Sequence, residues 1–568
     1  MTVMLRRRVI SNLVSPHLIA AYIGVVVSIL LVGAHSIWPT NVDWLAQGDL
    51  ASTQTAWNYF RHTSIAQWPP TIIENYGNGW NTFYMSAGGN LPLGIPFRFF
   101  NAFLPSSFQF IGIWTCLCFA LQGFFAAKII NLYISSKVLI VFLASNFLVA
   151  PIFIYRIGYM THSQLGAQWI LLCAIYLFLS KKGSSFQWAS LVAISLLIEM
   201  YMSIMVLTML LAFVFSRVIS SRSKDDKIRS ILILVPSFFV SLALLGLLGF
   251  FSLPGGISGE GFFRYSSTSL FDPRVSSTSS ASLAFNYFND LSNEFHLLPN
   301  GESFLFLGTG VVFFGLFFAL RDITKLRRIR WRFESTLILV CLGMFAVGLS
   351  NKVAFGTFEV SYWWPQVFSD LRQVVRAATR FGWPLYYLIC IYVCKSVVAI
   401  SARKFLRYVL AVLLISMNVV DQSPLLTAIA TKYRFEQNRP EKFRTEMKTI
   451  FNDFSELKIF PVFDLQLDNS TKYQSEVVWR NSPNLRGLLL AASELDKQIN
   501  FSYQSRPVGS IIDIENQRMV EKLTSGGINE GELYIFATHA DFMRFSSKFS
   551  FGVKTYFFED LFLAGIPN

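Results

Sequence analysis

Three carboxylates near the start of the chain are the side chains best suited to chemistry. Asp43, Asp49 and Glu74 are the only acidic residues among the first 198. All three lie in the stretch 37–107, which also holds five of the thirteen tryptophans. Because this stretch separates two long apolar runs, we expect Asp49 near a bilayer surface as a catalytic general base. The alternative is that Asp49 caps a helix beginning at Leu50, and the two roles can coexist.

Several cations are candidates for holding an anionic headgroup. Arg156 and His162 flank a short loop, where they would bind a phosphate or, alternatively, snorkel and cap a helix. Arg372, Arg376 and Arg380 recur every four residues and so share one helical face. We favour headgroup binding for this arginine row. Another candidate is Arg264, in a loop rich in glycine and serine that would be a substrate gate or a plain tether.

The composition indicates a polytopic membrane protein. Of 568 residues, 53% are hydrophobic and 14% are charged, and the mean hydropathy is +0.46. The net charge of +14 comes from Lys and Arg in short loops, where they set topology, so nucleic acid is not an expected partner. The six cysteines lie in apolar runs and predict neither disulfides nor a metal cluster.

Known catalytic motifs are missing from the sequence. It contains no Walker sequence, no His-Glu-x-x-His and no Gly-x-Ser-x-Gly. This argues against an ATPase, a zinc protease and a serine hydrolase.

Apolar runs predict about eleven transmembrane helices. The expected spans are 18–37, 108–130, 138–155, 163–180, 186–200, 201–218, 230–252, 303–320, 334–349, 381–399 and 405–420. The run 186–218 is the ambiguous part. We read it as two helices that meet near Glu199, because one helix would put neighbouring basic clusters on opposite faces.

The basic loops predict the orientation. With the N-terminus in the cytoplasm, most Lys and Arg between spans lie on the inner side. The loops 37–107, 253–301 and 350–380 and the C-terminal tail are then all outside. Residues 87–105 are expected to lie on the membrane surface or to be a plain connector.

The chain divides into a membrane domain, 1–420, and a tail, 421–568, which is expected to be a small extracytoplasmic α/β domain. Its helices are predicted at 440–457, 484–498 and 515–523. A strand is expected at 458–467, where Pro461 would confine it to a sheet edge, and a buried strand at 532–538.

Six short motifs resemble a bacterial membrane-protein family. They are Gly48–Asp49, AWNYFR (56–61), NLPLG (90–94), ESFLFLGTG (302–310), RFGWPLYYL (380–388) and VVDQSPLL (419–426). They are similar to DUF6311-like proteins, which are related to YfhO-type and other proteins of the GT-C glycosyltransferase fold. The resemblance implies a GT-C-like helical core with a large first outer loop and an outward catalytic groove.

The resemblance also implies an activity. Such proteins are thought to transfer sugars from polyprenyl-phosphate donors, with an early acidic residue as base, and by position that residue is Asp49. Relatives tend to carry an acid before the Pro-Leu of the third motif, where this chain has Asn90. The resemblance therefore implies no particular metal. The cofactor is unknown: a divalent metal is compatible with the sequence but is not indicated by it.

These observations lead us to expect a glycosyltransferase at the outer face of a bacterial inner membrane. It would use a polyprenyl-phosphate sugar donor and a lipid or envelope-glycan acceptor, with membrane lipids around it. Asp49 would be the base, and the substrate-binding candidates are Asp43, Arg61, Arg156, His162, Arg264, Arg376 and Arg380. The alternatives are a lipid or glycan transporter or flippase, and a non-catalytic GT-C-fold assembly factor.

Overall fold

The chain forms two compact units. The membrane unit comprises Met1–Ile37, Gly112–Leu242 and Phe262–Arg434, and the loop–tail unit comprises Trp38–Ile111, Ala243–Gly261 and Phe435–Asn568. The computed structural model describes residues 15–77, 79, 81–86, 90–159, 161–252, 304–323, 333–349, 352–355, 358–361, 363, 377–400, 403–435, 439–463, 478–479, 482–503 and 509–568. The first outer loop thus groups with the tail, whereas the sequence assigned it to the membrane domain.

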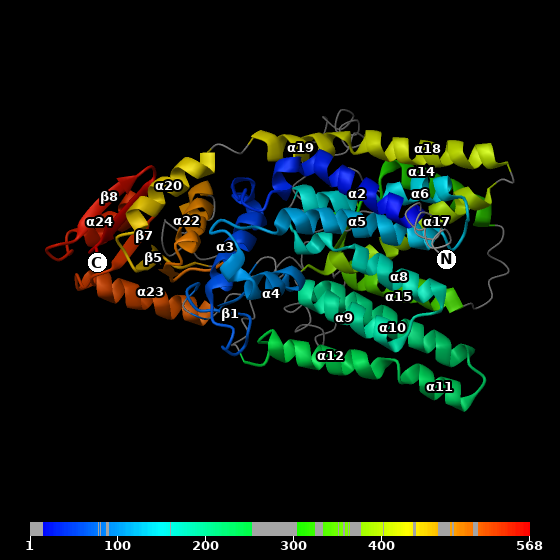
Figure 1. The fold of residues 1–568 in the computed structure, drawn as a ribbon, viewed down its shortest axis with the longest axis horizontal. Helices are drawn as coiled ribbons and strands as arrows, with labels where there is room; N and C mark the ends of the chain where they lie inside the picture. Colours follow the sequence, from blue (N-terminus) through cyan, green and yellow to red (C-terminus); the bar gives the residue numbers. More distant parts are fainter. Residues whose placement is uncertain are drawn as a thin grey trace, which may run out of the picture. The chain divides into compact units, whose positions relative to one another are not determined.

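Helices make up most of the membrane unit (Figure 1). They are α2 (Pro16–Val32), α5 (Ile111–Ile130), α6 (Lys137–Leu148), α7 (Pro151–Ile154), α8 (Trp169–Ser180), α9 (Ser185–Ile198), α10 (Met200–Ser220), α11 (Lys224–Ile231), α12 (Leu234–Leu247), α14 (Thr309–Asp322), α15 (Phe333–Gly348), α17 (Trp383–Ala399), α18 (Lys404–Asp421) and α19 (Ser423–Phe435). Each of the eleven predicted ranges overlaps at least one of them.

Not all of these helices have the length of a span. Within the described residues, four helical segments are long and apolar enough to cross a membrane, or six if each of two bent pairs counts as one span. The bent pairs are 137–148 with 151–159 and 404–421 with 423–433. The structure therefore supports a membrane protein, while the number eleven stays a prediction.

The ambiguous run 186–218 forms two helices, as predicted. Glu199 separates α9 from α10 in an extended conformation, with φ −160° and ψ 126°. Trp188, near the start of α9, lies 5.4 Å from Phe213, near the end of α10. The two helices are therefore antiparallel neighbours, and the basic clusters before α9 and after α10 lie at the same end.

Further contacts place basic side chains at that same end of the membrane unit. Lys181, after α8, pairs with Glu334 at the start of α15 at 3.0 Å. Lys395, near the end of α17, lies 5.1 Å from the ring of Tyr133. This clustering agrees with the predicted division between a basic end and an opposite end.

A buried polar junction joins two of the family-like motifs, 302–310 and 419–426. Residues 304–308 are non-helical and buried, and α14 starts directly after them. The backbone N–H of Thr309 donates to Asp421 Oδ2 at 3.1 Å, and that of Gly310 donates to Asn418 Oδ1 at 2.8 Å. Asn418 Nδ2 also donates to Asn146 Oδ1 at 2.6 Å, near the break between α6 and α7. These side chains satisfy the free N–H groups of a helix start where no water is at hand.

The loop–tail unit is built on a five-stranded sheet. Its strands are β5 (Glu456–Phe460), β6 (Gln498–Ile499), β7 (Glu532–Phe536), β8 (Lys554–Phe558) and β9 (Leu561–Gly565), in the order β6-β5-β7-β9-β8. β5 pairs in parallel with β6 and β7, and the other pairings are antiparallel. Its helices are α20 (Arg439–Phe451), α22 (Pro483–Glu494), α23 (Gly509–Thr524) and α24 (His539–Ser546).

The first loop supplies the remaining elements of this unit. They are α3 (Gly48–His62), the short strands β1 (Ile72–Ile73) and β2 (Asn81–Thr82), and α4 (Leu91–Phe99). α3 packs against α22: Asn58 Nδ2 donates to Ser493 Oγ at 3.0 Å, and the Tyr59 hydroxyl donates to the Lys497 carbonyl at 2.8 Å. The backbone of Gly77 donates to the carbonyl of Ile499 at 2.9 Å, which extends the contact to β6.

The tail is an α/β fold, as predicted, with one correction. β5 lies between β6 and β7, so the prediction of an edge strand is wrong. Pro461 follows the last residue of β5 and removes no hydrogen bond from the ladder, so a central position is compatible with it. The helix predicted at 440–457 ends at Phe451 because β5 begins at Glu456. The predicted strand 532–538 is confirmed, and all five residues of β7 are buried.

Two glycines test the packing of the membrane unit. A Cβ at Gly310 would lie 2.7 Å from the Leu414 carbonyl oxygen and 2.8 Å from Asn418 Oδ1, whereas a Cβ at Gly343 meets nothing within 4 Å. We expect Gly310→Ala to destabilise the protein by about 1–3 kcal/mol. Gly343→Ala should be neutral or stabilise α15 by up to about 1 kcal/mol. Thermal unfolding of both variants in one detergent measures this, and equal shifts would contradict the packing of α14 on α18.

Candidate functional site

Asp49 lies in the first turn of α3 and is held by the tail. Its Oδ1 accepts a hydrogen bond of 3.2 Å from the hydroxyl of Tyr503, 454 residues further along the chain. Gln47, and not Asp49, occupies the N-cap position, so the capping alternative is wrong. The carboxylate is half-buried, and the positive end of the helix dipole favours its charge.

Tyr503 is itself fixed by two further tyrosines. Its backbone N–H donates to the hydroxyl of Tyr76 at 2.9 Å. The ring of Tyr76 stacks on that of Tyr59 at 5.1 Å, and both rings are fully buried. The Asp49 carboxylate, followed by burial, raises the pKa of Tyr503 well above its usual value. Tyr503 therefore stays protonated at neutral pH and remains a hydrogen-bond donor to Asp49.

Asp43 belongs to a second contact between the loop and the tail. Its Oδ1 pairs with Arg444 Nη2 at 2.6 Å. Arg444 Nε lies 3.5 Å from Glu494 Oε2, and Lys448 pairs with the same carboxylate. The side chains of Arg444 and Glu494 are only 10% and 8% exposed, so the charges of this network are largely shielded from water. The pairing joins the start of the first loop to α20 and α22.

Arg61 has a structural explanation. It is 5% exposed, and its guanidinium donates to Asn101 Oδ1 at 2.6 Å and to the carbonyls of Ser106 and Pro105 at 3.0 and 2.9 Å. These bonds tie the end of α3 to the segment that leads into α5. These hydrogen bonds already account for the buried position of Arg61. Substrate binding by this residue stays a prediction.

The segment predicted to lie on the membrane carries exposed aromatic rings. Phe99, Phe100 and Phe103 are 62%, 60% and 85% exposed, and all lie within a dozen residues of the start of α5. Large exposed aromatic side chains close to a span are typical of the membrane interface. These residues favour the interfacial reading over a plain connector.

The predicted cations of the membrane unit lie at the end opposite its basic loops. Arg380 stacks at 4.8 Å on the ring of Tyr201, next to the start of α10. The guanidinium of Arg156 is fully buried, 5.8 Å from the ring of Trp383, which follows Arg380 by three residues. The backbone of His162 donates to the carbonyl of Arg156 at 3.0 Å. The structure thus brings Arg156, His162 and the segment from Arg380 to Trp383 into one region.

Other candidates lie outside the described residues, namely Arg264, Arg372 and Arg376. The described part of the chain has no group of three or more His, Cys, Asp or Glu arranged to hold a metal ion. Asn90, the first residue of the third family-like motif, is fully buried at the N-cap of α4.

Tyr503 and Arg444 were missed by the sequence reasoning. Each contacts a carboxylate more than 400 residues away, and neither sits in a motif with a recognisable spacing. The only available signal was the position of the carboxylates themselves in an otherwise acid-poor half of the chain.

The network around Arg444 predicts a stability difference. Arg444→Ala leaves Asp43 and Glu494 without their shared guanidinium and should lower the local stability of the loop–tail unit by about 2–3 kcal/mol. Lys442→Ala removes a cation of the same helix that is 83% exposed, and its effect should stay within about 0.5 kcal/mol. Hydrogen exchange of the amides of α3 and α20 reads out both variants. Equal protection in the two would show that Arg444 does not hold the loop.

Comparison with known proteins shows to which family the chain belongs. A family model described as a domain of unknown function, DUF6311, matches residues 21–423. The match covers the first loop with Asp43 and Asp49 and the membrane unit almost to its end, and it stops before Arg444 and Tyr503. A search of curated proteins found no match. With most of its length matched in this way, the chain belongs to the DUF6311 family.

Proposed function

We propose that this protein is a membrane glycosyltransferase of GT-C type. It would transfer a sugar from a polyprenyl-phosphate donor to a hydroxyl of an envelope lipid or glycan, at the outer face of a bacterial inner membrane. The observation that carries the proposal is Asp49, a half-buried carboxylate held by Tyr503 at the start of α3. A carboxylate whose orientation is fixed by a hydrogen-bond donor is prearranged for a proton transfer.

The topology supports an outer site. The first loop and the tail group into one compact unit, which supports the proposal that both lie on the same side of the membrane. The membrane unit collects basic residues at one end, which the basic-inside bias places in the cytoplasm. The sequence predicts ten spans between the first loop and the tail. An even number of spans returns the chain to the same side of the membrane, which agrees with this arrangement.

The proposed reaction assigns one proton transfer to Asp49. The carboxylate accepts the proton of the acceptor hydroxyl as the acceptor oxygen bonds to the anomeric carbon of the donor sugar. The bond between that carbon and the phosphate oxygen breaks, and the polyprenyl phosphate leaves with the electron pair. Arg156 and Arg380 would bind the donor phosphate and stabilise its developing charge. Arg376, which lies outside the described residues, keeps the same proposed role.

Asp49→Asn tests the base directly. It keeps the shape of the side chain and the contact with Tyr503 but removes the basic oxygen, so the rate of transfer should fall by about 10²–10⁴-fold. The measurement is sugar transfer by the purified protein from a polyprenyl-phosphate sugar to envelope glycans. Asp225→Asn, at an exposed carboxylate of α11, is the matched control and should keep full activity. Full activity of Asp49→Asn would remove this residue from the mechanism.

Tyr503→Phe tests how the base is held. The change removes one hydroxyl and leaves the ring, so we expect kcat to fall about tenfold, with KM for the acceptor nearly unchanged. A loss that came from poor folding would instead lower the amount of active enzyme and leave the kcat of each active molecule intact. Active-site titration with a labelled donor separates the two. An unchanged kcat per active site would show that Tyr503 does not orient Asp49.

A transporter is the second candidate, because the structure contains two bent helix pairs that meet at Asn146 and Asn418. Broken helices with polar side chains are common at transporter binding sites. Here the same polar groups cap α14, which accounts for them without a substrate. Transport of a lipid-linked sugar that is unaffected by Asp49→Asn would favour this candidate over the enzyme.

A further inference from the structure

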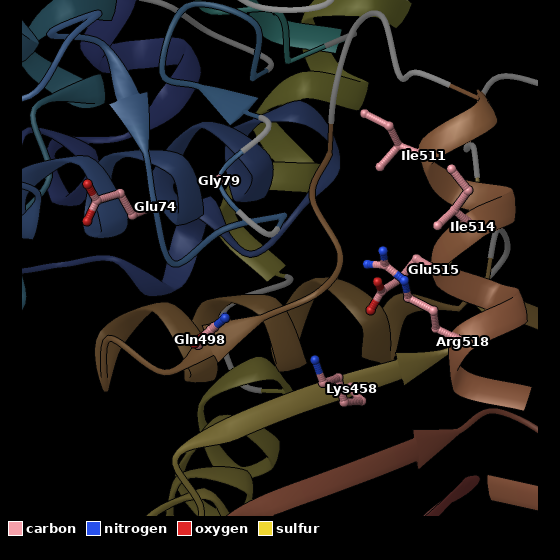
Figure 2. Close-up of a pocket in the computed structure, with 8 residues that line it drawn as sticks. All are labelled: Glu74, Gly79, Lys458, Gln498, Ile511, Ile514, Glu515 and Arg518. Atoms are coloured by element: carbon pink, nitrogen blue, oxygen red, sulfur yellow. The ribbon is translucent and has the colours of Figure 1, made fainter. Parts of the chain in front are cut away.

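The loop–tail unit contains a pocket of about 560 Å³. Its wall comes from both parts of the unit: Glu74 and Gly79 belong to the first loop, and Lys458, Gln498, Glu515 and Arg518 belong to the tail. Figure 2 shows the α23 side chains on one side of the space, Gly79 on the other, and Lys458 and Gln498 between them along the sheet. The volume lies within the range of roughly 300–1,000 Å³ that is usual for small-molecule sites.

The pocket is built on the same two segments that hold Asp49. Glu74 and Gln498 precede residues 75 and 499, whose backbones are joined by a 2.9 Å hydrogen bond from the Ile499 N–H to the Asn75 carbonyl. One residue further along the first segment is Tyr76, whose hydroxyl fixes the backbone of Tyr503. A ligand in the pocket therefore touches the segments that position the hydrogen-bond donor of Asp49.

The chemistry of the wall favours an uncharged, polar ligand. Two carboxylates, Glu74 and Glu515, balance the two cations, Lys458 and Arg518, and the ammonium of Lys458 is already bonded to Glu456. A phosphate or a polyanion would meet as many negative as positive groups. Charged side chains are, however, strong hydrogen-bond partners for hydroxyl groups, because the charge strengthens each bond.

The pocket also has an apolar side. Ile511 and Ile514 of α23 line it, and Ile514 is 51% exposed. A sugar ring presents hydroxyl groups at its edge and C–H groups on its face, which matches a wall of charged side chains facing two isoleucines. Among the described residues, the lining of this pocket contains no aromatic ring that could stack on a nucleobase.

We propose that this pocket binds the neutral saccharide part of an envelope-glycan acceptor. That the saccharide is an acceptor rests on the proposed function, which this inference deepens. Saccharide binding itself rests on the pocket alone. Gln498, Glu515 and Arg518 would hydrogen-bond the hydroxyl groups, and Ile511 and Ile514 would pack on the ring face. Recognition would thus rest on the tail side of the pocket.

The test is saccharide binding by the purified full-length protein in detergent. The probe is an array of short neutral and phosphorylated oligosaccharides, read without any donor present. We expect binding to neutral oligosaccharides, and about tenfold weaker binding for Glu515→Ala and for Arg518→Ala. Asp513→Ala is the matched control, since this exposed carboxylate is on the same helix but does not line the pocket, and it should bind as the unchanged protein does.

Three results would overturn the proposal: no binding to any oligosaccharide, binding restricted to phosphorylated ones, or equal binding by the pocket variants and Asp513→Ala. Circular dichroism and elution volume show whether each variant is folded, and Glu515→Gln, which keeps the size of the side chain, should lose less affinity than Glu515→Ala.

Asp49→Asn separates this inference from the proposed function. It should bind neutral oligosaccharides normally while failing to transfer sugar. Binding that depends on the pocket together with transfer that ignores Asp49 would refute the enzyme mechanism and leave the saccharide site in place. Transfer that needs Asp49 but is unaffected by every pocket variant would refute the role of the pocket as the acceptor site and leave the enzyme mechanism in place.

Discussion

The packing of α3 on α22 is the constraint on which the loop–tail unit depends. The first loop has a buried aromatic cluster of its own, in which Trp57, Phe60 and Phe83 pack together, and its helix α3 also makes polar contacts with the tail. Asn58, Tyr59 and the Asp43–Arg444 pair join it to the tail, and the hydrogen bonds are made in buried surroundings, where leaving a polar group without a partner is expensive. The loop is therefore held in part by its own aromatic packing and in part by residues from the other end of the chain.

This packing explains how the Asp49 carboxylate is held in one orientation. Tyr503 orients Asp49 through a hydrogen bond, and Tyr76 orients Tyr503 through another, so the three residues form a connected series. The stacked rings of Tyr59 and Tyr76 close this series against the helix on which Asp49 sits. A base that is prearranged in this manner need not reorganise during a reaction, which is how fixed groups contribute to catalysis.

The membrane unit solves a different problem. It contains non-helical backbone at residues 304–308 and two helix breaks, and each exposes N–H or C=O groups that lipid cannot satisfy. At the start of α14, Asp421 and Asn418 accept from backbone N–H groups, and Asn146 in turn accepts from the Asn418 side chain. Three of the family-like motifs converge here, since the Tyr386 hydroxyl also donates to the Leu307 carbonyl at 3.4 Å. The motifs of this unit are thus explained by helix capping before any substrate is considered.

The sequence by itself determined the class of the protein, the positions of its apolar helices, the hairpin at Glu199 and the α/β nature of the tail. These features follow from local patterns, because apolar runs, hydrophobic periodicity and basic loops can each be recognised within about twenty residues of sequence. It also singled out Asp49. Only the tertiary structure decided that the first loop belongs with the tail, that β5 is a central strand and that Tyr503 and Arg444 complete the carboxylate sites. The contacts of Asp43 with Arg444 and of Asp49 with Tyr503 join residues more than 400 positions apart, and β5 pairs with strands that follow it only after an intervening helix. No local pattern records a hydrogen bond whose partner lies so far along the chain.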